Sequence, residues 1–191
     1  MAYQEISGNI FNSKADALVN TVNCVGVMGK GIALEFRRRY PKMFEEYKDI
    51  CQKNQLKPGQ ILPYIKQTPW VLNFAIKKHW KFPSKIEWIE SCLDKFVKNY
   101  QAMGIKSVAL PWMGAMNGGI HLEQIKAITR KYLSHLPDIS VEVYDFDKTT
   151  VDPLFKKLKD IAQIPDLDVQ ILSKTSMILA ASCRKILSFL L

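Results

Sequence analysis

Apolar residues follow two different spacings along this chain. Short apolar runs, which are typical of buried strands, occupy residues 3–6, 17–22, 61–65, 70–74, 107–110 and 141–146. Segments with apolar residues three and four apart, which is the spacing of one helix face, occupy residues 32–40, 41–51, 86–100 and 125–136. Because strands alternate with helices, the pattern predicts an α/β fold, a layered sheet with helices on both faces.

Several helix ends carry local signals. Ser84, followed three residues later by Glu87, predicts a capping box at the start of the third helix, and Gly104 is expected to close that helix. Pro41 suits the first turn of the second helix, where its missing N–H is not needed. Beyond the last strand, Asp152-Pro153 predicts the start of another helix that carries Leu154, Leu158 and Ile161.

Two of the predicted strands lead directly into glycine-rich loops at residues 26–31 and 111–120. A strand, a glycine loop and a helix in this order point free backbone N–H groups and the positive end of the helix at an anion. The spacing of Gly26, Gly29 and Gly31 fits neither the dinucleotide fingerprint nor the triphosphate loop. A tight turn that uses glycine only for its positive φ is the alternative interpretation.

Ligands of parallel sheets bind outside the carboxyl ends of the strands. Both glycine loops, the cationic segment around Lys77 and the end of the last strand at Phe146 follow such ends. Asn20 and Asn23 leave their strand just before the first loop, and an amide that both donates and accepts suits sugar hydroxyls. The four segments therefore predict one crevice for a ligand with phosphate and ribose.

The composition narrows the setting of this site. A chain of 191 residues is long enough for one domain with a substantial core. Its net charge of +9 favours an acidic partner, whether nucleotide, DNA or RNA, although a merely solvated basic surface has the same charge. The cysteines and histidines form no cluster, so we expect no metal, no disulfide framework and no cofactor. The first residues resemble no secretory signal, which leads us to expect a cytoplasmic protein.

The last residues, 166–191, are apolar but interrupted by Lys174, Arg184 and Lys185. A transmembrane helix needs about 20 mostly uncharged residues, so we expect no membrane span. We expect instead a helix that docks on the domain or on a protein partner, with interfacial membrane contact as the alternative.

Four motifs resemble, in their order along the chain, those of the macrodomain family. They are 20–23, 26–33, 73–77 and 114–119. The resemblance is strongest to the DarG-type DNA ADP-ribosyl glycohydrolase branch and to phage and bacterial ADP-ribose 1''-phosphate processing proteins. It implies a three-layer α/β/α macrodomain over residues 1–160, with a mixed, mainly parallel sheet, and leaves residues 161–191 as a C-terminal helical extension.

The resemblance also implies an ADP-ribose site. The implied ligand-binding residues are Gly8, Asn9, Ile10, Asn20, Asn23, Val27, Met28, Gly29, Lys30, Gly31, Ile32, Gly114, Ala115, Met116, Asn117, Gly118, Gly119, Ile120 and Phe146. Asn9 would accept a hydrogen bond from the adenine amino group, Phe146 would pack on adenine, and Asn23 would meet the distal ribose. The two glycine loops would enclose the diphosphate. The alternatives are a turn asparagine at Asn9, a core aromatic at Phe146 and a solvated lysine at Lys30.

Lys77 is the catalytic residue that the resemblance implies. Its ammonium would stabilise or protonate the leaving group, or its neutral amine would attack the opened sugar as a Schiff-base nucleophile; the alternative is a lysine that only neutralises phosphate. The leading hypothesis is hydrolysis of ADP-ribosyl linkages, with DNA favoured over protein as the substrate. The alternatives are an ADP-ribose 1''-phosphate phosphatase and a binding module without catalysis. Ile76, which replaces a usual threonine, and the bulky Met116 motivate the binding module.

Overall fold

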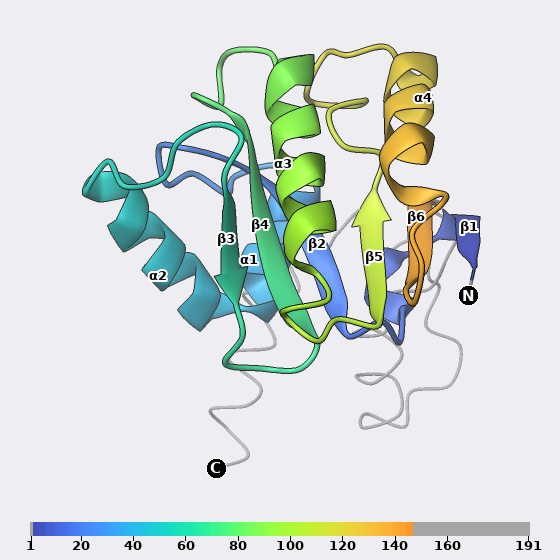
Figure 1. Ribbon diagram of the computed structural model, residues 1–191. Coiled ribbons are helices and arrows are strands. Elements are labelled where there is room, and N and C mark those ends of the chain that lie inside the picture. The colour runs from blue at the N-terminus through green and yellow to red at the C-terminus, as the bar shows by residue number, and fades with distance from the viewer. Residues whose placement is uncertain (1, 147–191) are drawn as a thin grey trace, which may run out of the picture. The chain divides into compact units, whose positions relative to one another are not determined.

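The computed structural model describes residues 2–146, which form a single six-stranded sheet with the strand order β1-β6-β5-β2-β4-β3. The strands are β1 (Tyr3–Gly8), β2 (Ala17–Asn23), β3 (Ile61–Tyr64), β4 (Trp70–Lys77), β5 (Ser107–Pro111) and β6 (Ser140–Phe146). β3 runs antiparallel to β4, whereas the other neighbours are parallel. The sheet is therefore mixed and mainly parallel, as the sequence predicts (Figure 1).

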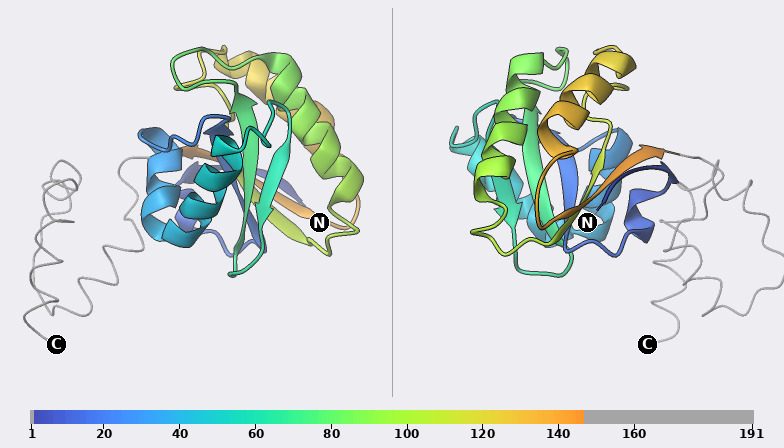
Figure 2. Two further views of the ribbon diagram at one scale, coloured as in Figure 1. Left: turned by 90° about the vertical axis from the view of Figure 1, so that its left-hand side faces the viewer. Right: turned by 45° about the vertical axis from the view of Figure 1, so that its right-hand side comes forward.

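Helices cover both faces of this sheet and give three layers (Figure 2). They are the short 3-10 helix η1 (Ile10–Asn12), α1 (Gly31–Arg39), α2 (Pro41–Gln52), α3 (Ile86–Asn99) and α4 (Leu122–Leu133). Alternate residues of β2 enter different cores. Ala17 and Val19 pack in the core that holds the apolar faces of α3 and α4, whereas Leu18 and Val22 pack in the core of α1 and α2.

The chain divides into two units after Phe146, and residues 2–146 belong to the first. The predicted boundary at residue 160, the helix starting at Asp152-Pro153 and the helical extension over 161–191 all lie outside the described residues. None of the described helices is long and apolar enough to cross a membrane.

Four local predictions were wrong. Gly104 does not close α3, because the C-cap of that helix is Tyr100 and Gly104 ends the turn that follows. The strand expected to end at Phe74 continues to Lys77, because β4 pairs with β2 over that whole length. The capping box is absent, since Lys85 is the N-cap of α3 and the buried hydroxyl of Ser84 has no hydrogen-bond partner. The fourth helix ends at Leu133, so Leu136 follows the helix rather than belonging to it.

Candidate functional site

The two glycine loops meet at the carboxyl ends of the parallel strands. A Cβ built on Gly31, which has a φ of +60°, would lie 2.7 Å from the amide nitrogen of Asn117. The starts of α3 and α4 and the end of β4 lie at this same edge of the sheet (Figure 1). The structure thus confirms that residues 26–31 and 114–120 come together although they are far apart in the sequence.

Asn23 organises the first loop. Its side-chain Nδ2 donates to the carbonyl of Val27 at 2.6 Å, while its Oδ1 accepts from the N–H of Val25 at 3.0 Å. The buried hydroxyl of Tyr47 donates to the Asn23 carbonyl at 2.8 Å and lies 3.1 Å from Oδ1. The side chain is only 7% exposed. Its amide therefore holds the loop in place, and contact of Asn23 with a ribose stays a prediction.

The side chains of Asn20 and Met28 are buried beneath this loop. Asn20 Nδ2 donates to Oδ1 of Asn73 on β4 at 2.9 Å and lies 3.8 Å from the Met28 sulfur. Asn73 in turn donates to the carbonyl of Leu62 at 3.2 Å. These side chains join β2, β4 and β3 below the site. Because the Met28 side chain is buried among them, only its backbone atoms are left to contact a ligand.

Helix α1 begins at the end of the first loop. Lys30 is its N-cap residue and forms no side-chain cap bond, so the first N–H groups of the helix receive no side-chain acceptor from it. Lys30 itself is exposed and Ile32 is partly exposed. The first N–H groups of a helix, with a lysine beside them, suit an anion. This geometry supports the predicted diphosphate position, which no contact tests.

The second loop is held by backbone hydrogen bonds and by close packing of glycines. The N–H of Ile120 donates to the Gly114 carbonyl at 3.1 Å, and the N–H of Ser84 donates to the Gly118 carbonyl at 2.9 Å. A Cβ on Gly118 would lie 2.7 Å from the carbonyl carbon of Gly114 and closer still to its Cα and oxygen. Met116 is 78% exposed, so its side chain projects into solvent and is not packed in a core.

Lys77 connects the end of β4 to the second loop. Its ammonium donates to the backbone carbonyl of Asn117, and the strand register shifts where Asn23 pairs with Lys77. Partial burial lowers the pKa of Lys77 below its usual value of 10.5. Ile76 is buried in the core of α3 and α4, so the side chain before Lys77 faces that core rather than the loops.

Asn9 directly follows the end of β1, and Phe146 ends the neighbouring strand β6. Gly8 pairs with Phe146 where β1 and β6 finish side by side. Asn9 is the N-cap of η1, and its Oδ1 accepts from the N–H of Phe11 at 3.0 Å, which is the turn role that the sequence left as an alternative. A carbonyl oxygen can accept a second hydrogen bond, so contact with adenine stays a prediction. The Ile10 side chain is buried.

The loops around this edge carry no negative charge. Residues 24–30, 78–85 and 112–121 contain no Asp or Glu. Over residues 2–146, no three His, Cys, Asp or Glu side chains come close enough to hold a metal ion, and Cys24, Cys51 and Cys92 are free thiols. The site therefore offers amide N–H groups and lysines, which are donors for an anionic ligand.

Sequence reasoning missed the role of Tyr47. In the sequence it is one apolar residue in the stripe of the second helix. Its buried hydroxyl bonds to Asn23, which is 24 residues away. Desolvation of this hydroxyl raises the Tyr47 pKa well above its usual value. The periodicity of α2 holds no signal for this contact, because it depends on how α2 packs against the end of β2.

Comparison with known proteins identifies the relatives of this fold. The Macro domain family model matches residues 19–129. A DNA ADP-ribosyl glycohydrolase of Thermus aquaticus is 39% identical over 144 residues, which cover 73% of this chain and 40% of that protein. Proteins described as ADP-ribose 1''-phosphate phosphatases match shorter stretches, of up to 101 residues.

Solved structures give the same result. The macrodomain of Mycobacterium tuberculosis DarG has a TM-score of 0.69 and 38% identity, covering 75% of this chain and 95% of that one. Thermosipho africanus DarTG, solved in complex with ADP-ribose, has a TM-score of 0.68 and 32% identity over 78% of this chain and 42% of that one. The chain spans about two fifths of the length of the curated glycohydrolases it matches. By its family model, its sequence relatives and its fold, this chain belongs to the macrodomain family.

Proposed function

We propose that the crevice between the two glycine loops binds ADP-ribose and that the chain releases it from a modified nucleic acid. Those backbone N–H groups of residues 26–31 and 114–120 that are not bonded within the loops would hold the diphosphate, since successive amides form concave anion sites. The adenine would lie towards Asn9 and Phe146, and the distal ribose towards Lys77. The description of the relatives as DNA ADP-ribosyl glycohydrolases supports nucleic acid over protein.

The observation that carries this proposal is the position of Lys77. Cleavage at the distal ribose carbon builds positive charge on the sugar and negative charge on the departing group. The Lys77 ammonium is bonded to the Asn117 carbonyl. In the proposed pose it would stand beside the distal ribose, where it could stabilise that negative charge. Residues 24–30, 78–85 and 112–121 contain no carboxylate, so we assign the assistance of departure to Lys77. The bond at the distal ribose carbon breaks with its electron pair on the departing group, water adds its oxygen to that carbon, and a proton from this water passes to the departing group.

The test is turnover of an ADP-ribosylated oligonucleotide by the wild type and by Lys77→Ala, Lys77→Arg and Lys98→Ala variants. Lys98 is a matched control, because it pairs with Asp94 in the last turn of α3, at the other end of that helix. We expect Lys77→Ala to lose about 10²–10⁴-fold in rate with the ADP-ribose Kd changed much less, Lys77→Arg to keep part of the rate, and Lys98→Ala to match the wild type.

Three results would each contradict a different part of the proposal. Unchanged turnover by Lys77→Ala would remove Lys77 from the reaction. Binding of ADP-ribose by calorimetry without turnover of modified DNA, modified protein or ADP-ribose 1''-phosphate would leave a binding module. Turnover of ADP-ribose 1''-phosphate alone would favour the phosphatase.

A further inference from the structure

The segment that follows Lys77 carries exposed aromatic rings among lysines. Trp80 is 50% exposed and Phe82 is 62% exposed, whereas most large apolar side chains of the described residues are buried. Lys78, Lys81 and Lys85 are also exposed. Between Asp49 and Glu87 the chain contains no acidic residue. We refer to residues 78–85 as the aromatic–basic segment.

The rings of this segment are ordered against one another rather than inserted in a core. The His79 ring stacks on Trp80 with centroids 5.4 Å apart and an interplanar angle of 27°, and it lies 5.6 Å from Phe82. The Lys81 ammonium lies 5.2 Å from the centre of the Trp80 ring. His79 also accepts from the backbone N–H of Lys81 at 3.2 Å. These contacts fix two exposed rings and a cation in one small area.

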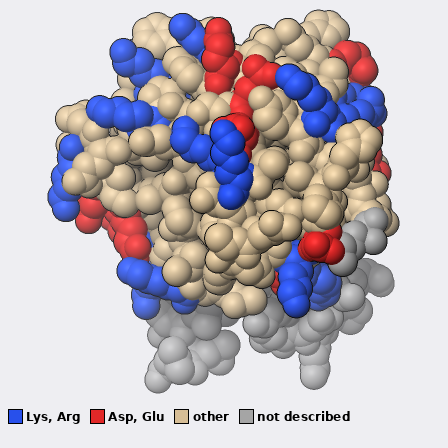
Figure 3. Space-filling model, viewed as in Figure 1, with Lys and Arg blue, Asp and Glu red and all other residues tan. Residues whose placement is uncertain are grey.

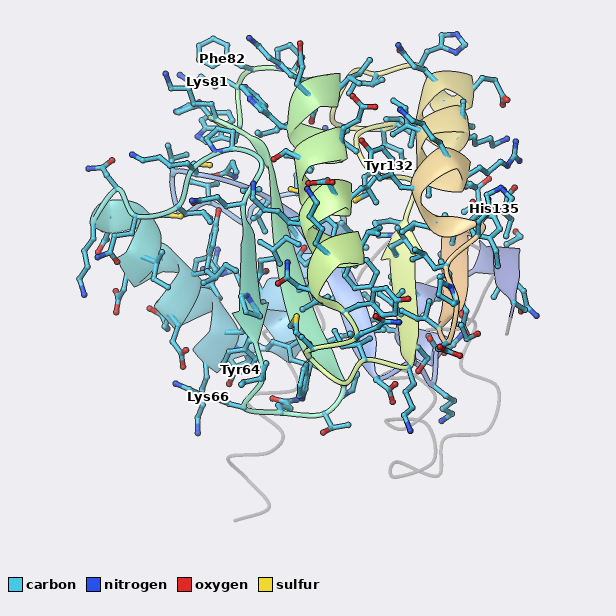
Figure 4. The ribbon with its side chains drawn as sticks, in the orientation of Figure 1. Tyr64, Lys66, Lys81, Phe82, Tyr132 and His135 are labelled. Carbon is cyan, nitrogen blue, oxygen red and sulfur yellow. The ribbon has the colours of Figure 1, made fainter. Side chains whose placement is uncertain are left out.

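This area adjoins the candidate site. Trp80 is three residues after Lys77, so their Cα atoms are at most about 11 Å apart. Figure 3 shows several Lys and Arg side chains at the upper left of the visible face, where the end of β4 and the following segment lie in Figure 1, with acidic side chains beside them at the top and other basic side chains elsewhere on the face. Figure 4 labels Lys81 and Phe82 at this end of the sheet, and Tyr64 and Lys66 at the opposite end.

Exposed aromatic rings interleaved with lysines fit a single-stranded nucleic acid. Bases without a pairing partner can stack on rings, while lysines track the phosphates. In a duplex the base faces are already stacked on one another, so no base would be accessible for stacking on these rings. A protein partner would also cover rings, but it gives no reason for lysines with no acidic residue among them.

Building on the function proposed above, we propose that the aromatic–basic segment docks the unmodified nucleotides next to the ADP-ribosylated one, by base stacking on Trp80 and Phe82 and phosphate contacts to Lys78 and Lys81. The segment would hold a single strand with the modified nucleotide directed at Lys77. It would therefore contribute to substrate choice from outside the ADP-ribose crevice.

The experiment measures fluorescence anisotropy of an unmodified, labelled oligothymidylate of about 12 nucleotides, within the usual site sizes, on the full chain. The variants are Trp80→Ala/Phe82→Ala, Lys78→Ala/Lys81→Ala and the control Ile65→Ala, an apolar residue 57% exposed beside the labelled Tyr64 and Lys66. We expect the double aromatic variant to weaken binding at least about tenfold, because each stacked base contributes about 1–3 kcal/mol. The control should bind as the wild type does.

Three further arms separate stacking from charge. A duplex of the same length should bind more weakly than the single strand. Heparin, a polyanion without bases, should bind the aromatic variant as well as it binds the wild type but bind the lysine variant more weakly. The lysine variant should also show a shallower dependence of oligonucleotide affinity on salt. Circular dichroism melting of each variant checks that it folds.

Equal oligonucleotide binding by wild type and Trp80→Ala/Phe82→Ala would overturn this proposal and leave the rings for a protein partner. Because the probe carries no ADP-ribose, the result is independent of the hydrolase assay. If oligonucleotide binding depends on the rings but no substrate turns over, the docking surface stands and the proposed reaction is rejected. If a substrate turns over but binding does not depend on the rings, the reaction stands and the docking surface is rejected.

Discussion

Gly118→Ala tests whether the shape of the second loop determines ADP-ribose binding. The added Cβ would lie 2.7 Å from the carbonyl carbon of Gly114, whereas carbon atoms in contact are usually about 3.5–4.0 Å apart. The atoms in the way belong to the Gly114 backbone and not to a flexible side chain, so the backbone at Gly114 or at Gly118 must move by about 1 Å.

The cost follows from the hydrogen bonds that this movement disturbs. The Gly118 carbonyl accepts from Ser84 N–H and the Gly114 carbonyl accepts from Ile120 N–H. At about 0.5–1.5 kcal/mol each, their loss amounts to about 1–3 kcal/mol. If ADP-ribose requires the native loop, this corresponds to a Kd raised about 5- to 150-fold.

The assay is titration calorimetry with ADP-ribose beside urea unfolding. Gly104→Ala is the matched control, since Gly104 also has a positive φ, of +70°, but a Cβ there meets nothing within 4 Å. It should lose about 1 kcal/mol of stability from backbone strain and keep the wild-type Kd. A Gly118→Ala protein that is folded and binds ADP-ribose within about twofold of the wild type would refute the reasoning.

Three other predictions follow from the site. Asn23→Asp replaces the donor to the Val27 carbonyl with a carboxylate oxygen, which repels that carbonyl and disturbs the first loop. It should therefore weaken ADP-ribose binding more than tenfold by calorimetry. An unchanged Kd would show that Asn23 does not hold the loop in its binding conformation. Burial lowers the Lys77 pKa, so if hydrolysis needs the ammonium, its rate should fall as the pH rises, and the fall should begin at a pH lower than 10.5. This fall should be absent in Lys77→Arg, whose side chain stays protonated. A rate that rises with pH would assign the reaction to the neutral amine instead. Asn73→Leu should lower the free energy of unfolding in urea by about 1–3 kcal/mol, because it leaves the buried Asn20 amide without its hydrogen-bond partner. The Asn20→Leu/Asn73→Leu double variant should lose less than the sum of the two single variants. Additive losses would contradict the pairing.

The sequence by itself determined the elements and the edge where the site lies. Apolar runs and helical spacing depend on neighbours a few residues away, so they indicated strands such as 107–110 and the helix at 86–100 before any packing was known. Glycine loops after strands pointed to the carboxyl edge for the same local reason. The order of the four motifs added the family.

The tertiary structure decided what each site residue does. β4 continues to Lys77 because it pairs with β2 over that length, and the Lys77 ammonium at its end donates to the Asn117 carbonyl. Ser84 matched a capping box, but its N–H is bonded to the Gly118 carbonyl and the helix begins one residue later than the box requires. Asn23 became the centre of the first loop through Tyr47, which lies on another element. Such contacts join residues that are distant along the chain, and no local pattern encodes which distant partners will satisfy a buried polar group.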